Sequence, residues 1–288
     1  MFYSGIADEA GRDLAMQIRA HQELGWGHIE LRMVGESQFT DVSDQQFDQI
    51  VAALDAADLK VSCFASAIAN WGTKITEPLE NALTTLDRAI PRMHRLGTPF
   101  IRVMGWPNDG LSNDQWRAQA VSRMKELAKR AEDGGVTLVL ENCDGWPATS
   151  PKAFGEFFEL VDSPAFKAVY DTGNAASHGH DNTWQWYQAA KPHIIYVHIK
   201  SHTGPQPDGS AGDHVYPDQP NRSEVRRTLT DLFTGGYDGG ISIEPHLETV
   251  IDKNTRISDA EAAYQTYVEY GRRTMKLVAQ AKSDAQAG

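Results

Sequence analysis

The sequence has little cysteine, no excess of basic residues and no long hydrophobic run. Cys63 and Cys143 are too few for a disulfide framework, which favours a reducing compartment, and we expect the cytoplasm. Lys and Arg number 27 against 39 Asp and Glu, and this net charge of −12 argues against a nucleic-acid partner. No signal peptide or transmembrane run is recognisable, so we also expect no membrane partner.

The chain also lacks a low-complexity linker that would divide it into domains. Its 288 residues are 41% hydrophobic, which suffices for one large core. We predict a single domain over residues 1–282. Residues 283–288 are small and polar, and we expect them to form a flexible tail.

Two patterns alternate along the chain. β-rich runs cover residues 2–6, 28–32, 60–64, 100–104, 137–141, 168–171, 194–199 and 240–244. Helical spacing covers residues 12–24, 43–57, 76–96, 113–133, 151–162, 221–235 and 258–281. Serine N-caps are expected at Ser43, Ser112 and Ser150, and helix ends at Gly25, Gly97 and Gly134.

Eight strands that alternate with helices predict parallel βαβ units. The alternative to a closed barrel is a doubly wound open sheet, which usually has a glycine-rich turn after its first strand. Residues 7–11 read Ala-Asp-Glu-Ala-Gly, which is no dinucleotide fingerprint. We therefore predict an α/β protein formed by a single (β/α)8 TIM barrel.

Four consecutive predicted strands end on a residue that can bind a metal. These residues are Glu141, Asp171, His198 and Glu244. The carboxyl ends of barrel strands share one rim, where active sites of such barrels lie. Charges at the ends of apolar strands are costly unless they are paired or bind a metal, although each residue alone also fits a surface cap. Three carboxylates and an imidazole favour one divalent ion, Mn²⁺ first, with Mg²⁺ or Co²⁺ possible.

Further residues are candidates for substrate contact. Lys200 and His246 lie two residues beyond ligands and should share their faces, while Asn174 follows a ligand closely. Three tryptophans follow strands on the same rim: Trp71 after the third, and Trp106 and Trp146, each in a Gly-Trp-Pro segment, after the fourth and fifth. We expect one or more of them in the pocket. Their indole faces suit sugar rings, and the alternative is packing at the barrel mouth.

The rim has few cations for an anionic substrate. Arg32, Arg102 and Lys200 are the candidates, with Arg32 assigned to substrate binding, and no glycine-rich phosphate cradle is visible. We therefore expect an unphosphorylated substrate.

Motifs on five strands match a known family. They are Ile29-Glu-Leu-Arg32, Leu140-Glu-Asn142, Tyr170-Asp-Thr-Gly-Asn174, Val197-His-Ile-Lys200 and Ile243-Glu-Pro-His246. With them, the chain resembles the sugar phosphate isomerase/epimerase superfamily of xylose isomerase-like barrels over roughly residues 3–280. The resemblance implies that the four ligands hold the metal and that Glu141 and Glu244 are the acid/base pair. It implies a metal-dependent isomerase or epimerase of a sugar or keto-sugar.

The sequence departs from the ketose 3-epimerases of that superfamily at two positions. They have a histidine where this chain has Asn174, and an arginine that is absent from residues 198–204. A lyase that dehydrates or eliminates from an inosose or 3-keto glycoside is therefore the main alternative. A nuclease of the apurinic-site type would need further rim histidines. A noncatalytic subunit with a partner chain, or a homo-oligomer, also stays open.

Overall fold

The computed structural model describes residues 1–250, 256–257 and 259–287. Its main sheet has eight parallel strands in the order β1-β10-β9-β8-β7-β6-β5-β2. They are β1 (Phe2–Gly5), β2 (His28–Leu31), β5 (Lys60–Phe64), β6 (Phe100–Gly105), β7 (Thr137–Gly145), β8 (Phe166–Asp171), β9 (Ile194–Ile199) and β10 (Gly240–Ile243). A parallel bridge from Ile6 to Glu30 joins the two ends of the sheet. The predicted TIM barrel is thereby confirmed.

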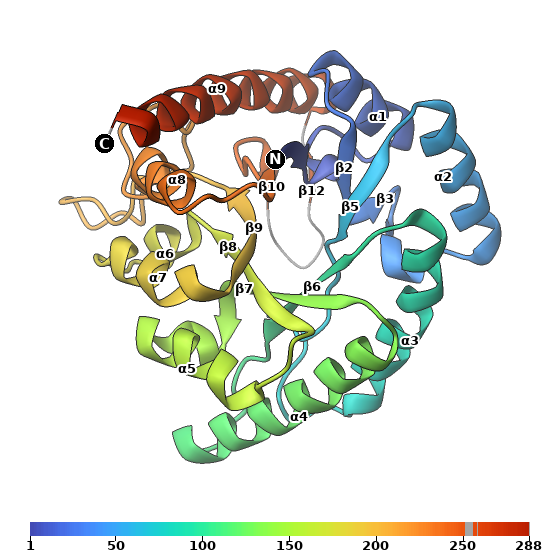
Figure 1. Ribbon diagram of the computed structural model, residues 1–288, viewed down its shortest axis with the longest axis vertical. Helices are drawn as coiled ribbons and strands as arrows, with labels where there is room; N and C mark the ends of the chain where they lie inside the picture. Colours follow the sequence, from blue (N-terminus) through green and yellow to red (C-terminus); the bar gives the residue numbers. More distant parts are fainter. Residues whose placement is uncertain (251–255, 258, 288) are drawn as a thin grey trace.

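Helices surround the barrel in a ring (Figure 1). They are α1 (Leu14–Glu23), α2 (Asp44–Ala56), α3 (Leu79–Leu96), α4 (Asn113–Asp133), α5 (Pro151–Val161), α6 (Asn174–Ser177), α7 (Thr183–Ala190), α8 (Val225–Thr234) and α9 (Ala260–Ala287). Short 3-10 turns cover Ala7–Glu9, Phe39–Asp41, Trp146–Thr149 and Lys191–His193, and the small strands β3 (Met33–Val34), β4 (Ser37–Gln38), β11 (Thr249–Val250) and β12 (Arg256–Ile257) form two hairpins. The last helix, α9, lies beside both α1 and α8, so the end of the chain closes the ring next to its beginning.

The predicted serine caps are confirmed. Ser43 and Ser112 each begin a helix with a capping box, and the Ser150 hydroxyl accepts the backbone N–H of Ala153. Such caps satisfy backbone donors that the first helical turn leaves free. Gly97 ends α3 with a φ of 65°, a left-handed conformation that glycine adopts without strain.

Two parts of the chain differ from the sequence-based expectation. Residues 172–193 contain α6 and α7, which helical spacing did not indicate, because each is eight residues or shorter and lacks a side-chain N-cap. In addition, α9 continues to Ala287, through most of the segment expected to be a flexible tail. Arg226 on α8 makes two hydrogen bonds to Asp284, at 2.7 and 2.9 Å, and these tie the last turns to the barrel.

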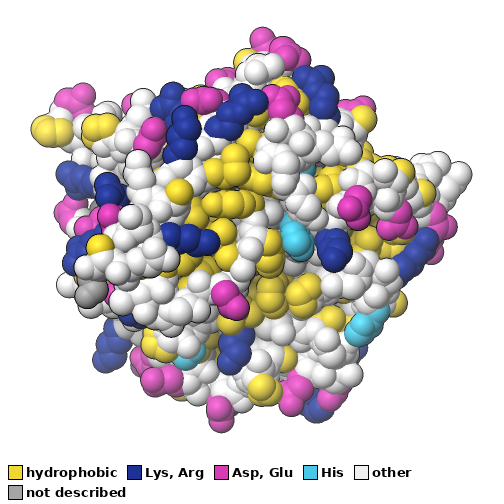
Figure 2. Space-filling model, turned by 45° about the horizontal axis from the view of Figure 1, so that its top comes forward, with side chains coloured by type: hydrophobic (Ala, Val, Ile, Leu, Met, Phe, Trp, Pro, Cys, Tyr) yellow, Lys and Arg dark blue, Asp and Glu magenta, His cyan; other side chains and the backbone are white. Residues whose placement is uncertain are grey.

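The core has two layers. Large apolar side chains fill the space between the barrel and its helices, and a small cluster of Cys63, Val139, Val169 and Tyr196 lies within the barrel. Acidic and basic side chains are interspersed on the face that Figure 2 shows. Among the described residues, no helix is long and apolar enough to cross a membrane.

Candidate metal centre and active site

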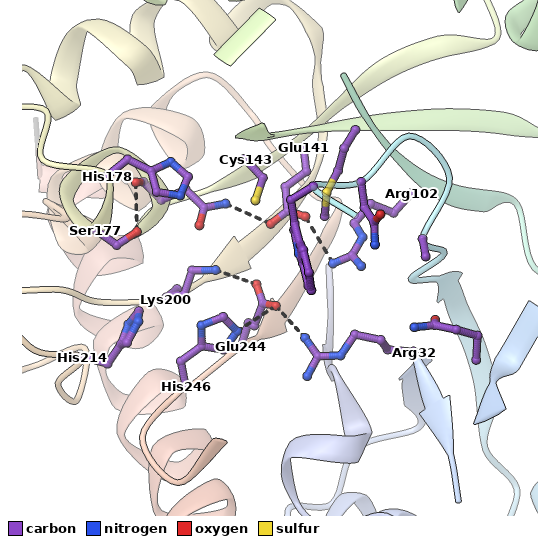
Figure 3. Close-up of a pocket in the computed structure, with 16 residues that line it drawn as sticks. Arg32, Arg102, Glu141, Cys143, Ser177, His178, Lys200, His214, Glu244 and His246 are labelled. Carbon is purple, nitrogen blue, oxygen red and sulfur yellow. Dashed lines mark hydrogen bonds and ion pairs between the residues drawn. The ribbon is translucent and has the colours of Figure 1, made fainter. Parts of the chain in front are cut away.

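A pocket of about 400 Å³ opens at the carboxyl ends of the strands. Six of the predicted site residues line it, namely Arg32, Glu141, Asn174, Lys200, Glu244 and His246. Figure 3 shows their charged groups converging from opposite walls, with Glu244 facing Lys200 and Arg32, and Glu141 facing Arg102. The structure thus brings together residues that come from the second to the last strand of the barrel.

The four predicted metal ligands meet beside this pocket, and two of them, Glu141 and Glu244, line it. Glu141 lies on β7, Asp171 ends β8, His198 lies on β9, and Glu244 directly follows β10. One ligand atom from each lies within 4.8 Å of the others, and all four residues are buried. The parallel register explains this, because Asp171 pairs with His198 and the Glu244 N–H donates to the Ile199 carbonyl.

Three ligand atoms in this cluster are buried and make no hydrogen bond. They are Glu141 Oε2, Asp171 Oδ2 and His198 Nδ1. The two carboxylate oxygens face cations, since Arg102 Nη1 is 3.2 Å from Glu141 Oε2 and Lys200 Nζ is 3.1 Å from Asp171 Oδ2. Buried acceptors are normally hydrogen-bonded. Four residues of this chemistry, with one ligand atom from each within 4.8 Å of the others and three atoms without a hydrogen bond, fit a divalent cation.

Hydrogen bonds around the cluster occupy the opposite oxygens of the carboxylates. Asp171 Oδ1 accepts the backbone N–H groups of Gly173 at 2.8 Å and Asn174 at 2.7 Å. The Asn174 side chain donates to Glu141 Oε1 at 3.0 Å, and Asn142 holds the Asp171 backbone through both its N–H and its carbonyl. These contacts fix one carboxylate oxygen of Asp171, one of Glu141 and the backbone of Asp171, as expected of residues that orient metal ligands.

Glu244 is contacted by two cations and an imidazole. Arg32 Nη1 lies 3.0 Å and His246 Nε2 3.1 Å from Oε1, while Lys200 Nζ donates to Oε2 at 2.9 Å. Burial would raise the pKa of Glu244, but Lys200, His246 and Arg32 hold it well below its usual range. Burial acts likewise on Glu141, yet Arg102 brings its pKa down to about 2. Both glutamates are therefore ionised at neutral pH.

Arg32 also binds two acidic residues of the first 3-10 turn. Its guanidinium lies 3.1 Å from Asp8 Oδ1 and 3.3 Å from Glu9 Oε1. The backbone N–H of His246 donates to Glu9 Oε2 at 2.7 Å, and His246 has a φ of 54°, which is uncommon for a non-glycine residue. Asp8 and Glu9 therefore hold two side chains that line the pocket.

Sequence reasoning did not identify three acidic residues of this site, Asp8, Glu9 and Glu30. Arg102, which the sequence indicated as a rim cation, lines the pocket. Around the pocket, buried carboxylates (Asp8, Glu9, Glu30, Glu141, Asp171, Glu244) outnumber the buried Lys and Arg groups (Arg32, Arg102, Lys200). The sequence signal that could have identified the three acidic residues is a charged residue inside or directly after an apolar strand, because a buried charge is costly without a partner. The surplus of negative charge favours a bound cation.

Trp71 is the tryptophan that lines the pocket, and its relative exposure is 42%. Trp106 and Trp146 are buried, at 1% and 4%, and are not among the lining residues. Trp106 packs next to α4, where its carbonyl accepts the Trp116 indole N–H. Substrate contact by Trp106 and Trp146 therefore stays a prediction without direct support from this geometry.

Comparison with known proteins bears on this arrangement. The family model described as xylose isomerase-like TIM barrel matches residues 18–272. A 2-epi-5-epi-valiolone 7-phosphate 2-epimerase from Actinoplanes sp. is 25% identical over 222 residues, which cover 76% of this chain and 77% of that protein. The family match spans most of the barrel and all four candidate ligands.

Solved structures of low sequence identity share the fold. D-psicose 3-epimerase with D-tagatose from Clostridium cellulolyticum has a TM-score of 0.72 and 16% identity, covering 98% of this chain and 99% of that one. A probable 3-DHS dehydratase from Bacillus anthracis has a TM-score of 0.69 and 16% identity, and the match covers 96% of this chain and 99% of that one. A xylose isomerase-like TIM barrel protein from Mycobacterium smegmatis in complex with magnesium has a TM-score of 0.65 and 16% identity, and the match covers 96% of this chain and 97% of that one.

Proposed function

The chain belongs to the xylose isomerase-like TIM barrel family, and from this premise we propose that it isomerises or epimerises a sugar or keto-sugar with a divalent metal. The observation that carries the proposal is the buried cluster beside the pocket, in which four potential ligands lie within 4.8 Å of one another and three of their atoms lack a hydrogen bond. The relative from Actinoplanes is named as a 2-epimerase of 2-epi-5-epi-valiolone 7-phosphate, which supports epimerisation as the reaction.

The proposed ligands are Glu141, Asp171, His198 and Glu244, and the proposed ion is Mn²⁺, because oxygen donors dominate the set. When bound, the ion would stabilise negative charge on a substrate oxygen after a neighbouring carbon loses its proton. Cys63 and Cys143 are free thiols, which supports the proposal of a reducing cytoplasmic compartment.

Proton transfer is assigned to Glu141 and Glu244. They reach the pocket from opposite sides of His198, whose Nδ1 lies 3.7 Å from Glu141 Oε1 and 3.8 Å from Glu244 Oε2. Both are ionised at neutral pH, so either can accept a proton from a carbon next to a carbonyl. For epimerisation, the other glutamate must first take up a proton from water, which it then delivers to that carbon from the opposite side. Their low pKa values make them weak bases, so the reaction depends on charge stabilisation at the substrate oxygen.

Substrate binding is assigned to polar groups and one indole around this centre. Lys200 and His246 line the pocket within reach of Glu244, and Asn174 lines it next to Glu141. The exposed indole of Trp71 offers an apolar face suited to the C–H face of a sugar ring. We therefore add Trp71 to the proposed substrate contacts.

A lyase is the second candidate. Elimination begins with the same proton abstraction and then expels a substituent from the next carbon, so the same two glutamates would serve. Asn174, where ketose 3-epimerases have a histidine, and the dehydratase among the structural neighbours both favour this alternative.

The test is deuterium incorporation, measured by mass spectrometry. Mn²⁺-loaded protein is incubated in D2O with ketoses, inososes and 3-keto glycosides, beside Glu141→Gln and Glu244→Gln. We expect metal-dependent uptake at one carbon with an unchanged skeleton, reduced about 100-fold or more in both variants. Loss of water or an aglycone would identify the lyase. Absence of both reactions with every substrate would contradict the proposed function.

A further inference from the structure

Glu30 is a charged side chain inside the barrel that lies outside the pocket. It is on β2, its relative exposure is 0%, and it is absent from the residues that line the pocket. Burial of a carboxylate is costly unless it is hydrogen-bonded and paired. Contact with substrate does not offset the cost of burying Glu30, so groups within the barrel must stabilise its carboxylate.

The partners of Glu30 come from β9 and β10. His198 Nε2 lies 3.2 Å from each carboxylate oxygen. The Tyr196 hydroxyl donates to Oε2 at 3.0 Å, and the Ser242 hydroxyl donates to the same oxygen at 2.6 Å. Tyr196 and Ser242 each stand two residues before a proposed metal ligand, on the same face of the strand. They hold the carboxylate directly against the imidazole.

This geometry determines which ring nitrogen faces the ligand cluster. A carboxylate accepts hydrogen bonds, so His198 donates its Nε2–H to Glu30. Nδ1 is then left facing Glu141 and Glu244 without a hydrogen bond. Rotation of the ring by half a turn would break the contact with Glu30 and turn Nδ1 away from the cluster. The carboxylate therefore sets both the orientation and the tautomer of the ligand.

We propose that Glu30 is a positioning residue, which holds the proton of His198 on Nε2 and directs Nδ1 at the divalent metal of the cluster. The proposal rests on the proposed metal site and adds to it a residue that touches neither metal nor substrate. Loss of such an outer carboxylate commonly lowers metal affinity by about 10-fold to 100-fold.

The first test measures metal affinity directly. Mn²⁺ binding to the full chain is titrated by calorimetry for wild type, Glu30→Gln and Tyr196→Phe, with circular dichroism as a check of folding. Glu30→Gln keeps the shape of the side chain and removes its charge, and we expect affinity to fall at least about 10-fold. Tyr196→Phe removes one hydroxyl from Glu30 and keeps the carboxylate on His198, so we expect a change below about threefold.

The second test is made on the wild type and does not depend on whether Glu30→Gln folds. Nitrogen-15 spectra of histidine in the Mg²⁺-loaded wild type should show the His198 proton on Nε2, assigned by comparison with His198→Gln. A proton on Nδ1, or a Glu30→Gln affinity within twofold of wild type, would overturn the proposal. Failure of the wild type to bind Mn²⁺ or Mg²⁺ would overturn the metal site itself, so the two failures are distinguishable.

Discussion

Metal affinity should depend steeply on pH, because the His198 imidazole carries a proton on both ring nitrogens in the metal-free protein. Burial of the imidazole would lower its pKa, but the charge of Glu30 and the contacts with Glu141 raise the pKa of His198 to about 10. Nδ1 must lose this proton before it binds a cation. At pH 7 the loss costs roughly 4 kcal/mol, at about 1.36 kcal/mol per pH unit. We expect apparent affinity to rise about tenfold per pH unit from pH 6 to pH 8.

A second ligand should take up a proton in mild acid. Burial raises the pKa of Asp171 and Lys200 only partly offsets this, so the pKa of Asp171 is about 6. The lowered pKa values of Glu141 and Glu244 keep both ionised over this range. The metal-free protein therefore binds more protons than the loaded form, and affinity falls as pH falls. Below pH 6 the slope should approach about a hundredfold per pH unit.

Calorimetry in pairs of buffers with different ionisation enthalpies counts the protons released on Mn²⁺ binding. We expect about one proton at pH 7.5, and between one and two at pH 5.5. His178→Gln is the matched control, because His178 lines the pocket but is not a proposed ligand. It should leave both counts unchanged. Binding without proton release at pH 7.5, or an affinity that is equal at pH 6.5 and pH 7.5, would refute this reasoning.

Three further predictions concern single residues. Lys200→Met removes a charge that lies 2.9 and 3.1 Å from two ligand oxygens, so titration should show tighter Mn²⁺ binding, with slower deuterium exchange. Trp71→Ala should raise KM about tenfold with little loss of stability. Trp106→Ala removes a buried side chain and should lower the free energy of unfolding in urea by about 3–5 kcal/mol. Equal losses of stability in the two variants would contradict this. Gly145→Ala would place a Cβ 2.0 Å from backbone and should cost more than about 3 kcal/mol, against about 1–2 kcal/mol for Gly110→Ala, which has open space.

The sequence by itself determined the order of elements and the rim on which the ligands lie. Alternation of β-rich and helical segments predicts parallel units, and the strand bounds agree with the structure to within a few residues. Because parallel strands of a barrel end on one rim, residues at four successive strand ends were expected to be neighbours. Glu141, Asp171, His198 and Glu244 are indeed brought together there. These inferences needed only local periodicity and one rule of topology.

Only the tertiary structure decided which residues surround that cluster. Glu30 comes from β2 and reaches His198 on β9 across the barrel, while Glu9 reaches His246 from the first turn. Of the three rim tryptophans that the sequence indicated, Trp71 lines the pocket, whereas Trp106 and Trp146 are buried. The closed barrel brings these residues together, although 168 positions separate Glu30 from His198 and 237 separate Glu9 from His246. Local patterns specify strands and faces, but contacts across a barrel depend on how its whole circumference closes.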